Sequence, residues 1–152
     1  QLADNIVRRY GVDRERVLAM PFGPSPLLFA PTDQPGGAVL QQYGLQPGYF
    51  FYPAQFWPHK NHVRIVQALA QLRSAGLDVI VAFTGSDKGN LRHVQTLVRT
   101  LDLDDRVRFL GMVPAGHMHE LYAHSAALVM PTYFGPTNLP PLEAWTMGKP
   151  LI

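Results

Sequence analysis

The sequence contains no cysteine, so a disulfide framework and a cysteine-ligated metal site are both excluded. No apolar run approaches the roughly 18 residues that a membrane-spanning helix needs, and residues 1–10 lack the apolar stretch of a signal peptide. Charged residues make up only 16% of the chain, and the net charge of +2 comes from scattered basic residues. We therefore expect no membrane span and no nucleic-acid partner.

Apolar residues, in contrast, make up 47% of the 152 residues, which is enough for one globular domain with a core. The chain begins without methionine and stops at "GKPLI", residues 148–152, where a strand is starting. We therefore expect a piece of a longer protein, with part of any functional site outside these residues.

Proline and glycine interrupt the first third of the chain. Residues 2–12 have the pattern of a short helix that ends at Gly11, and residues 16–23 resemble a strand. Residues 23–48 show no sustained period and predict a surface connection, with one helical turn at 39–45. The predicted organisation is a lead-in segment followed by a domain, with the bounds 1–48 and 49–152.

From residue 49 onward, short apolar runs alternate with longer amphipathic stretches. The predicted strands are 49–54, 78–85, 107–113 and 127–133, with another beginning at 150. The predicted helices are 60–76, 90–103, 116–125 and 139–149. Strands that are apolar on both faces and separated by helices imply right-handed crossovers and a parallel sheet. The predicted fold class is α/β, a Rossmann-like parallel sheet with helices on both faces.

An open parallel sheet binds ligands at the carboxyl ends of its strands. The loops expected there are 54–61, 84–90, 111–117 and 131–138. Loop 84–90 carries Gly85 and Gly89 without a full dinucleotide or P-loop motif, so it is either a weak phosphate signal or a plain turn. The spacing of the sequence supports no nucleophile elbow and no Ser/His/Asp trio.

Lys60 is expected at the opening of the helix that follows the first of these strands. A lysine over a helix N-terminus is electrostatically unfavourable unless an anion lies between them. Lys60 is therefore either a diphosphate clamp or a solvated lysine.

The last predicted helix begins near Asn138, a favourable N-cap, with Pro140 and Pro141 in its first turn. Because proline has no N–H group, the amides left for an anion are those of Thr137, Asn138 and Leu139. Glu143 lies one turn further on. It either faces a ligand or is simply favoured there by the helix dipole.

A metal site is not indicated. Residues 102–105, "DLDD", have the D-x-D spacing of metal-dependent sugar transferases but come before their strand, at the wrong edge of the sheet. No histidine pair is joined by a carboxylate at ligand spacing. We interpret Phe56, Trp57 and Trp145 as core aromatics in preference to residues at a cleft edge.

Several motifs occur in the order found in one known family. The stretch "YPAQFWPHKN" resembles the family loop G-R-x-x-x-x-K-N, and "GPTNLPPLEAWTMGKPLI" resembles its E-G-x-G-x-x-x-x-E helix entrance. The stretch "VRRYGVDRERVLAMPFG" looks like the segment that leads in from the interdomain linker. Over nearly its whole length, the chain resembles the C-terminal, donor-binding half of a GT-B glycosyltransferase of the retaining family 4 (group 1).

The resemblance implies a role for each matching residue. Lys60 would bind the donor diphosphate and Glu143 the ribose hydroxyls, and these two are the predicted catalytic residues. The backbone at Met112 and Val113 would hold the nucleobase. The residues expected to complete the nucleotide-sugar site are Gln55, Gly85, Gly135, Thr137, Asn138 and Leu139.

Two departures from the family pattern concern the donor. Gln55 stands where the family has arginine, so one phosphate-binding charge is missing. Gly135 stands where the family has the first glutamate, which contacts the donor sugar, and Pro136 follows where the family has glycine. Thr137 and Asn138 offer neutral hydrogen bonds nearby. The form "FGPTNLPPLEA" looks like a variant from bacterial polysaccharide-building transferases, which favours altered donor recognition over lost activity.

The function implied by the resemblance is retaining transfer of a sugar from a nucleoside-diphosphate donor to a hydroxyl, without metal or cofactor. Its partners would be the nucleotide sugar and an N-terminal acceptor-binding domain of the same chain. The expected location is the cytoplasm, with peripheral membrane association of the whole protein left open, and the fragment alone is expected to be inactive. The alternatives are a non-catalytic nucleotide-sugar-binding module, a GT-B nucleotide-sugar epimerase and, more distantly, a flavodoxin-like domain.

Overall fold

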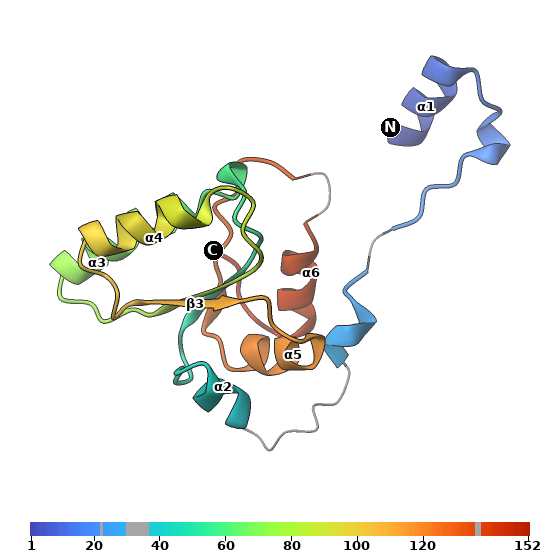
Figure 1. The fold of residues 1–152 in the computed structure, drawn as a ribbon. Coiled ribbons are helices and arrows are strands. Elements are labelled where there is room, and N and C mark those ends of the chain that lie inside the picture. The colour runs from blue at the N-terminus through green and yellow to red at the C-terminus, as the bar shows by residue number, and fades with distance from the viewer. Residues whose placement is uncertain (22, 30–36, 136–137) are drawn as a thin grey trace.

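The computed structural model describes residues 1–21, 23–29, 37–135 and 138–152 (Figure 1). Its centre is a sheet of parallel strands in the order β3-β2-β1-β4. The strands are β1 (Phe50–Pro53), β2 (Val81–Thr84), β3 (Val107–Gly111) and β4 (Ala127–Leu128). The predicted α/β class is therefore confirmed.

The chain changes direction across the sheet after β3. The first strand, β1, is central: its residue Phe51 pairs with Ala82 of β2 on one side and with Leu128 of β4 on the other. Beyond β4, Leu151 forms a further parallel bridge with Leu128. The Ile152 N–H also donates to the Leu128 carbonyl at 2.9 Å, so the strand expected from residue 150 has begun.

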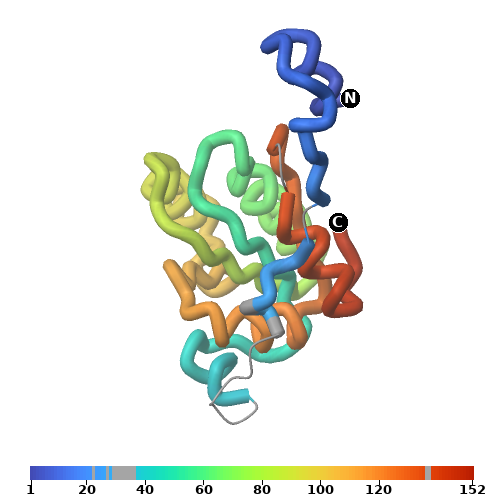
Figure 2. Tube along the Cα trace, turned by 90° about the vertical axis from the view of Figure 1, so that its right-hand side faces the viewer, coloured from blue at the N-terminus to red at the C-terminus, as the bar shows by residue number. Residues whose placement is uncertain are grey.

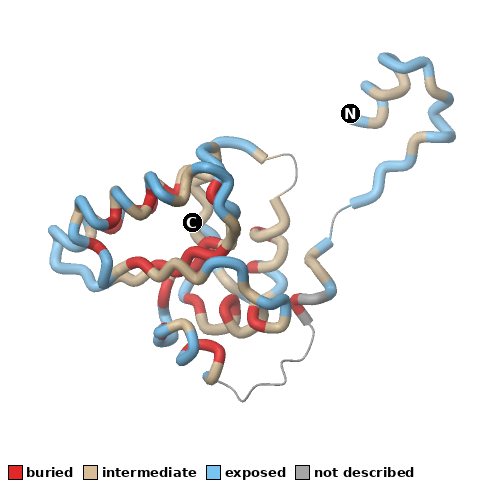
Figure 3. The backbone as a smooth tube through the Cα atoms, in the orientation of Figure 1, coloured by how far each residue is buried: buried red, intermediate tan, exposed pale blue. Residues whose placement is uncertain are grey.

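Helices cover both faces of this sheet (Figures 1 and 3). One core cluster joins the sheet to α3 and α4, and a second joins it to α2, α5 and α6. The helices are α1 (Leu2–Tyr10), α2 (Ala38–Gln42), α3 (His62–Ser74), α4 (Leu91–Thr100), α5 (Ala115–Ala123) and α6 (Leu139–Thr146). Short 3₁₀ turns lie at η1 (Arg14–Arg16), η2 (Pro26–Phe29) and η3 (Pro58–Lys60).

The apolar run of β1 is explained by these two layers. Successive side chains of a strand point to opposite faces, so Phe51 joins the cluster under α5 and α6 and Tyr52 joins the one under α3 and α4. Both rings are buried. The hydroxyl of Tyr52 is satisfied by the Lys60 carbonyl at 2.8 Å, which ties the strand to the loop that follows it.

Two expectations for the first third of the chain are wrong. Residues 16–23 form no strand where they are described, and Leu18 is 84% exposed, because no neighbouring strand lies beside it to supply backbone partners. Residues 23–48 are not all a surface connection, since Leu28, Val39 and Leu40 are buried in the core under α5 and α6. The position of a domain boundary stays a prediction.

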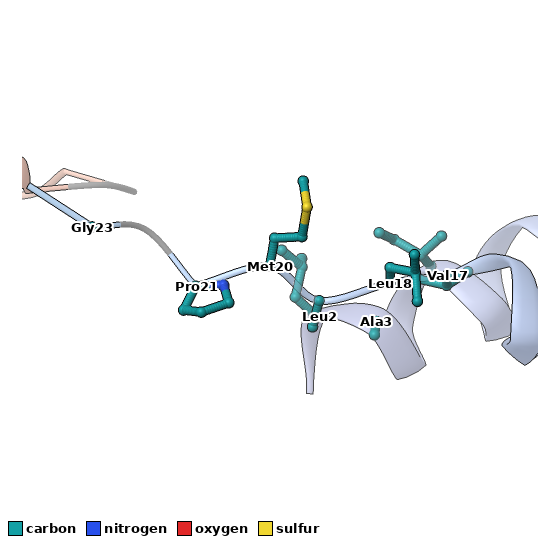
Figure 4. A pocket seen from close by; sticks show the side chains of 9 residues that line it. Leu2, Ala3, Val17, Leu18, Met20, Pro21 and Gly23 are labelled. Carbon is teal, nitrogen blue, oxygen red and sulfur yellow. The ribbon is translucent and has the colours of Figure 1, made fainter. Parts of the chain in front are cut away.

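The N-terminal segment projects away from the sheet and its helices (Figure 2). Helix α1 has no buried residue and ends, as expected, at Gly11, whose φ of 62° is left-handed. Apolar side chains of α1 and of residues 17–21 line an open hollow of about 550 Å³ (Figure 4). No charged group lines this hollow, so we do not take it as the functional site.

Asp102, Asp104 and Asp105 lie at the amino edge of the sheet, before β3. Asp102 pairs with Arg73 at 3.2 Å, and Arg73 also approaches Asp105. No cluster of three metal-ligating side chains occurs among the residues that the structure describes.

His62 is the first residue of α3 and is fully buried among aromatic rings. Its ring stacks on Phe56 with centroids 4.3 Å apart and lies 4.8 Å from Tyr52 and 5.2 Å from Phe83. Neither ring nitrogen has a well-aligned hydrogen-bond partner among the described residues. Burial lowers the pKa of His62 to about 4, the Ala54 backbone opposes the shift, and the charge of Lys60 adds to it.

We expect the free energy of unfolding to fall as the pH drops from about 6.5 towards 4, because unfolded His62 binds a proton that the folded protein excludes. The contribution is complete above the unfolded pKa and is lost as the pH falls towards the folded pKa. Integrated over this window, the loss is roughly 3 kcal/mol. Urea titrations at a series of pH values measure it, and His62→Leu should flatten the profile.

The control is His93→Leu, which removes an exposed histidine from α4 and should leave the profile unchanged. An equal flattening in both variants would show that the acid sensitivity does not come from the buried ring.

Candidate functional site

The sheet order identifies where a ligand crevice should lie. The chain runs from β1 through β2 to β3 on one side of β1, and then crosses to β4 on the other side. The loops after β1 and β4 therefore leave the same edge side by side, at the topological switch point where open α/β sheets bind ligands.

Hydrogen bonds join these two loops directly. The Tyr133 N–H donates to the His59 carbonyl at 3.0 Å, and the Thr132 hydroxyl donates to the same carbonyl at 3.2 Å. The side-chain amide of Asn61 donates to the Pro131 carbonyl at 3.1 Å. Residues before and after Lys60 are therefore both tied to the loop that leads to α6.

Lys60 has a fixed backbone and a free charge. Its carbonyl accepts the Tyr52 hydroxyl, and its neighbour Asn61 takes a left-handed φ of 56° before α3 begins at His62. Lys60 therefore ends η3 and does not open α3, a small correction to the expected position. Its ammonium group has no carboxylate within ion-pair distance among the described residues, and its expected role as a diphosphate ligand stays a prediction.

Gly85 holds the β2 loop against the β1 loop. Its φ is +148°, and an added Cβ would lie 2.5 Å from the Ala54 carbonyl oxygen. The adjacent Ser86 carbonyl accepts the Phe56 N–H at 3.0 Å. Gly85 thus permits a close backbone contact that helps to place residues 54–60. Its expected contact with a nucleotide stays a prediction.

Asp87 is a residue of this loop that sequence reasoning missed. Its carboxylate accepts the Leu91 N–H at 3.1 Å and the Gly89 N–H at 2.8 Å. The hydrogen bonds from Leu91 and Gly89 lower the pKa of Asp87. The side chain caps the start of α4, a role that an aspartate just before a helix could have indicated.

The side chain of Gln55 is exposed beside Trp57. Its amide oxygen accepts the Trp57 indole N–H at 3.1 Å. Trp57 is 42% exposed, so the prediction that it belongs to the core is wrong, whereas Phe56 is buried as predicted. Trp145 is also mostly exposed, on the outer face of α6. Neither tryptophan is buried, because the helices and strands of the described chain do not enclose its ring.

Met112 and Val113 follow the end of β3. Met112 is 71% exposed, whereas Val113 packs against the core cluster under α5 and α6. The carbonyl of the preceding Gly111 accepts the Thr84 hydroxyl at 2.6 Å, which joins this loop to the end of β2. The loop expected to meet a nucleobase therefore leads directly into α5.

Glu143 lies on α6, partly buried, and is oriented from α5. Its Oε2 accepts the hydroxyl of Tyr122 at 2.7 Å. Tyr122 is buried and packs edge-on against Phe51, with centroids 5.1 Å apart. Burial, together with the charge of Glu143, raises the pKa of Tyr122, which keeps its hydroxyl a donor. One carboxylate oxygen is held, and Oε1 has no protein partner among the described residues.

A cavity of about 110 Å³ lies beside Glu143. It is lined by Ser25 and Leu28 of the lead-in segment, by Ala115 and Met118 of α5, and by Glu143 itself. The fold thus brings the carboxylate to the helix that follows Met112 and Val113. The cavity is smaller than the roughly 300–1,000 Å³ typical of ligand pockets, so it can enclose only part of a ligand.

Asn138 is the N-cap of α6, but its side chain makes no capping hydrogen bond. The expectation of an ordinary asparagine cap is wrong because Pro140 and Pro141 occupy the positions whose N–H groups a cap would bind. The side-chain oxygen instead lies over Gly135, in the space where a Cβ at that position would project. Thr137 lies outside the described residues, and the Leu139 amide remains a predicted donor.

The fold and these loops define a class before any relative is considered: a Rossmann-like domain whose loops after β1 and β4 meet at the switch point of the sheet. Solved structures that share this fold include GT-B glycosyltransferases. WaaG, a glycosyltransferase involved in lipopolysaccharide biosynthesis, aligns with a TM-score of 0.74 and 24% identity, over 99% of this chain and 41% of that one. Anabaena Alr3699/HepE in complex with UDP and glucose aligns with a TM-score of 0.74 and 20% identity, and the alignment covers 97% of this chain and 40% of that one.

The family itself follows from the sequence match. The profile of glycosyl transferases group 1 covers residues 41–152, so the chain belongs to this family, as the resemblance predicted. It is 27% identical to D-inositol 3-phosphate glycosyltransferase of Nocardia farcinica, over 99% of this chain and 35% of that protein. It is 26% identical to the O-antigen chain mannosyltransferase RfbU of Salmonella typhimurium, over 98% of this chain and 38% of that protein. The chain thus spans little more than a third of these relatives.

Within the described residues, no helix has the length and apolar character needed to cross a lipid bilayer.

We expect Gly85→Ala to lower the free energy of unfolding by about 2 kcal/mol or more, because the new Cβ meets the Ala54 carbonyl and the backbone angle becomes strained. Gly89→Ala is the matched control, since Gly89 has a positive φ of 91° in the same loop but nothing within 4 Å of an added Cβ. Gly89→Ala should lower the free energy of unfolding by only about 1 kcal/mol. Equal losses in the two variants, measured by urea titration, would contradict the close-contact role of Gly85.

Proposed function

We propose that this chain is the donor-binding domain of a retaining glycosyltransferase, which transfers a sugar from a nucleoside diphosphate to a hydroxyl acceptor. One observation carries the proposal: the loops after β1 and β4 are hydrogen-bonded together at the switch point, on both sides of Lys60. A lysine whose backbone is held at the carboxyl edge of the sheet suits the diphosphate of a nucleotide sugar.

Lys60 stabilises the negative charge that builds on the departing diphosphate. The bond between the anomeric carbon and the diphosphate oxygen breaks, and the acceptor oxygen forms the new bond on the same face. The leaving phosphate accepts the acceptor's proton, so this half of the site needs no general base. Lys60 supplies charge stabilisation that is greatest when the leaving group is most negative. Charge stabilisation from Lys60 is the basis for proposing metal-independent transfer.

Glu143 binds the ribose hydroxyls of the donor. Its Oε1 is the oxygen available for them, since Oε2 is held by Tyr122. The neighbouring cavity accommodates the edge of the nucleoside, and the backbone of Met112 and Val113 meets the base. Structures of Anabaena Alr3699/HepE with UDP and with UDP-glucose support nucleotide-sugar binding by this fold.

Polysaccharide or glycan synthesis is the proposed setting. The named relatives include an O-antigen chain mannosyltransferase and a glycosyltransferase involved in lipopolysaccharide biosynthesis. We also propose that a second domain of the whole protein binds the acceptor and covers the exposed apolar surface formed by α1 and Leu18. Turnover would then need both domains, and the fragment alone would bind donor without transferring it. Location in the cytoplasm, with or without membrane association, stays a prediction.

In the full-length protein, we expect Lys60→Ala to weaken nucleoside-diphosphate binding roughly ten- to a hundredfold, because a charge-assisted contact is lost. Glu143→Gln should weaken it by about tenfold or less, since an amide keeps an acceptor oxygen. Calorimetric titration with UDP, GDP, ADP and dTDP measures both effects and identifies the base.

The controls are Lys149→Ala and Glu15→Gln, which remove the same charges far from the crevice: Lys149 precedes the strand starting at 150, and Glu15 lies in η1. No binding of any of the four nucleotides by folded protein would contradict donor binding. Nucleotide-sugar binding without transfer or release would instead indicate a non-catalytic module.

Tyr122→Phe should reduce the preference for ribose over 2′-deoxyribose, because it frees the Glu143 carboxylate to rotate. The measurement compares UDP with 2′-deoxy-UDP, and GDP with its deoxy form, in both proteins. Tyr49→Phe is the matched control, since the Tyr49 hydroxyl is equally buried but donates to the Leu121 carbonyl. A preference that is unchanged in Tyr122→Phe would mean that Tyr122 does not orient the carboxylate.

A further inference from the structure

Exposed aromatic side chains gather on the loops after β1 and β4. Among the described residues, the exposed aromatic side chains are Tyr10, Trp57, Tyr133, Phe134 and Trp145. Three of these five lie on the two loops, which are hydrogen-bonded to each other. Single exposed aromatic residues are ordinary, whereas a group of them on one surface is typical of an interaction site.

The rings form a stack that crosses from one loop to the other. His59 stacks on Phe134 with centroids 4.6 Å apart and planes 21° from parallel. Trp57 stacks on His59 with centroids 6.2 Å apart, and the Lys88 ammonium lies 5.9 Å from the Trp57 ring centroid. The stack therefore has a cation at its Trp57 end and an exposed ring at its Phe134 end.

Phe134 is held in place although 65% of it is exposed. The Thr132 hydroxyl is shared between the His59 and Phe134 carbonyls, at 3.2 and 3.0 Å. The Tyr133 N–H also donates to the His59 carbonyl. One face of the Phe134 ring rests on His59, so its exposed area includes the other face. The loop thus presents a flat apolar surface whose position is set before any ligand binds.

This surface lies beside the proposed diphosphate ligand. His59 directly precedes Lys60, so Phe134 stacks on the residue next to that lysine. In the transfer proposed above, the acceptor oxygen attacks on the face from which the diphosphate departs, and the leaving phosphate takes its proton. The acceptor must therefore be held next to the diphosphate, in the neighbourhood of Lys60 and Phe134.

We propose that the exposed face of Phe134 binds a sugar ring of the acceptor. A pyranose has a face of C–H groups and a rim of hydroxyls, so the face packs on an aromatic ring while the hydroxyls stay in water. The inference rests on the proposed function and names the acceptor class, a glycan or glycoside. It also gives this domain a share in acceptor recognition, in addition to the second domain.

The test measures acceptor binding separately from donor binding. In the full-length protein saturated with its preferred nucleoside diphosphate, the methyl glycosides of glucose, mannose, galactose and N-acetylglucosamine are titrated by saturation-transfer NMR. We expect at least one to bind, and Phe134→Ala to weaken it about three- to tenfold because a stacking contact is lost. The affinity for the nucleoside diphosphate should stay within about twofold.

Two further variants at the same position test the flat face itself. Phe134→Tyr keeps the ring and should retain the glycoside affinity, whereas Phe134→Leu keeps only an apolar side chain and should not. Trp145→Ala is the matched control, since it removes an exposed aromatic ring from α6 and should leave glycoside binding unchanged. Thermal unfolding of each variant shows whether a loss of binding reflects a loss of fold.

A double-mutant cycle tests His59 as the support of the Phe134 ring. His59→Ala should also weaken the glycoside, because Phe134 loses the ring on which it rests, and His59→Phe should restore a stacking partner. When Phe134→Ala is already present, adding His59→Ala should cause little further loss. Additive effects would overturn the argument that His59 acts through Phe134.

The outcomes distinguish this proposal from the proposed function. If the wild type binds nucleotide but none of the glycosides, the acceptor contact is overturned and donor binding stands. The contact is also overturned if Phe134→Ala weakens the preferred nucleotide sugar instead of the glycoside, or if it lowers thermal stability without changing either affinity, as expected for a ring packed against the second domain. If the folded wild type binds no nucleotide, the proposed function fails and this inference fails with it.

Discussion

The hydrogen bond from the Tyr133 N–H to the His59 carbonyl joins two loops that are far apart in the sequence. It is possible only because β4 pairs with β1, which places the ends of the first and last complete strands next to each other. Everything assigned to the crevice depends on this adjacency. Lys60 is held by the first loop, and the second loop leads into α6, which carries Asn138 and Glu143.

The Lys60 loop packs on a layer of buried aromatic rings. His62, immediately after Asn61, is enclosed by Phe56, Tyr52 and Phe83, and burial keeps its ring neutral at physiological pH. A charged group at this position would add positive charge close to Lys60 and would need water. The neutral ring instead lets α3 begin against the sheet and leaves Lys60 as the cation at the edge of the loop. The buried, neutral ring of His62 therefore contributes to the stability of the fold and also limits the positive charge next to Lys60.

On the other side of the crevice, polar side chains are arranged by buried partners and by proline. Tyr122 fixes one oxygen of Glu143 from the core, so the carboxylate presents its other oxygen. The two prolines remove the backbone donors that Asn138 would otherwise bind, and its oxygen has no hydrogen-bond partner in the part of the chain that the structure describes. In both cases, packing around the start of α6 decides which polar atom has no protein partner among the described residues.

The sequence by itself determined the alternation of strands and helices and the parallel sheet, because apolar periodicity is a local property. Short motifs also pointed to Lys60 and Glu143, whose roles stay predictions. It could not indicate that Leu28 and Val39 enter the core or that Trp57 stays exposed, since burial depends on which elements cover a residue. The partners of Glu143 and Gly135, namely Tyr122 and the Asn138 amide, were likewise hidden. Only the tertiary structure decided these contacts, because distances between side chains are set by strand order and helix packing, which no local pattern encodes.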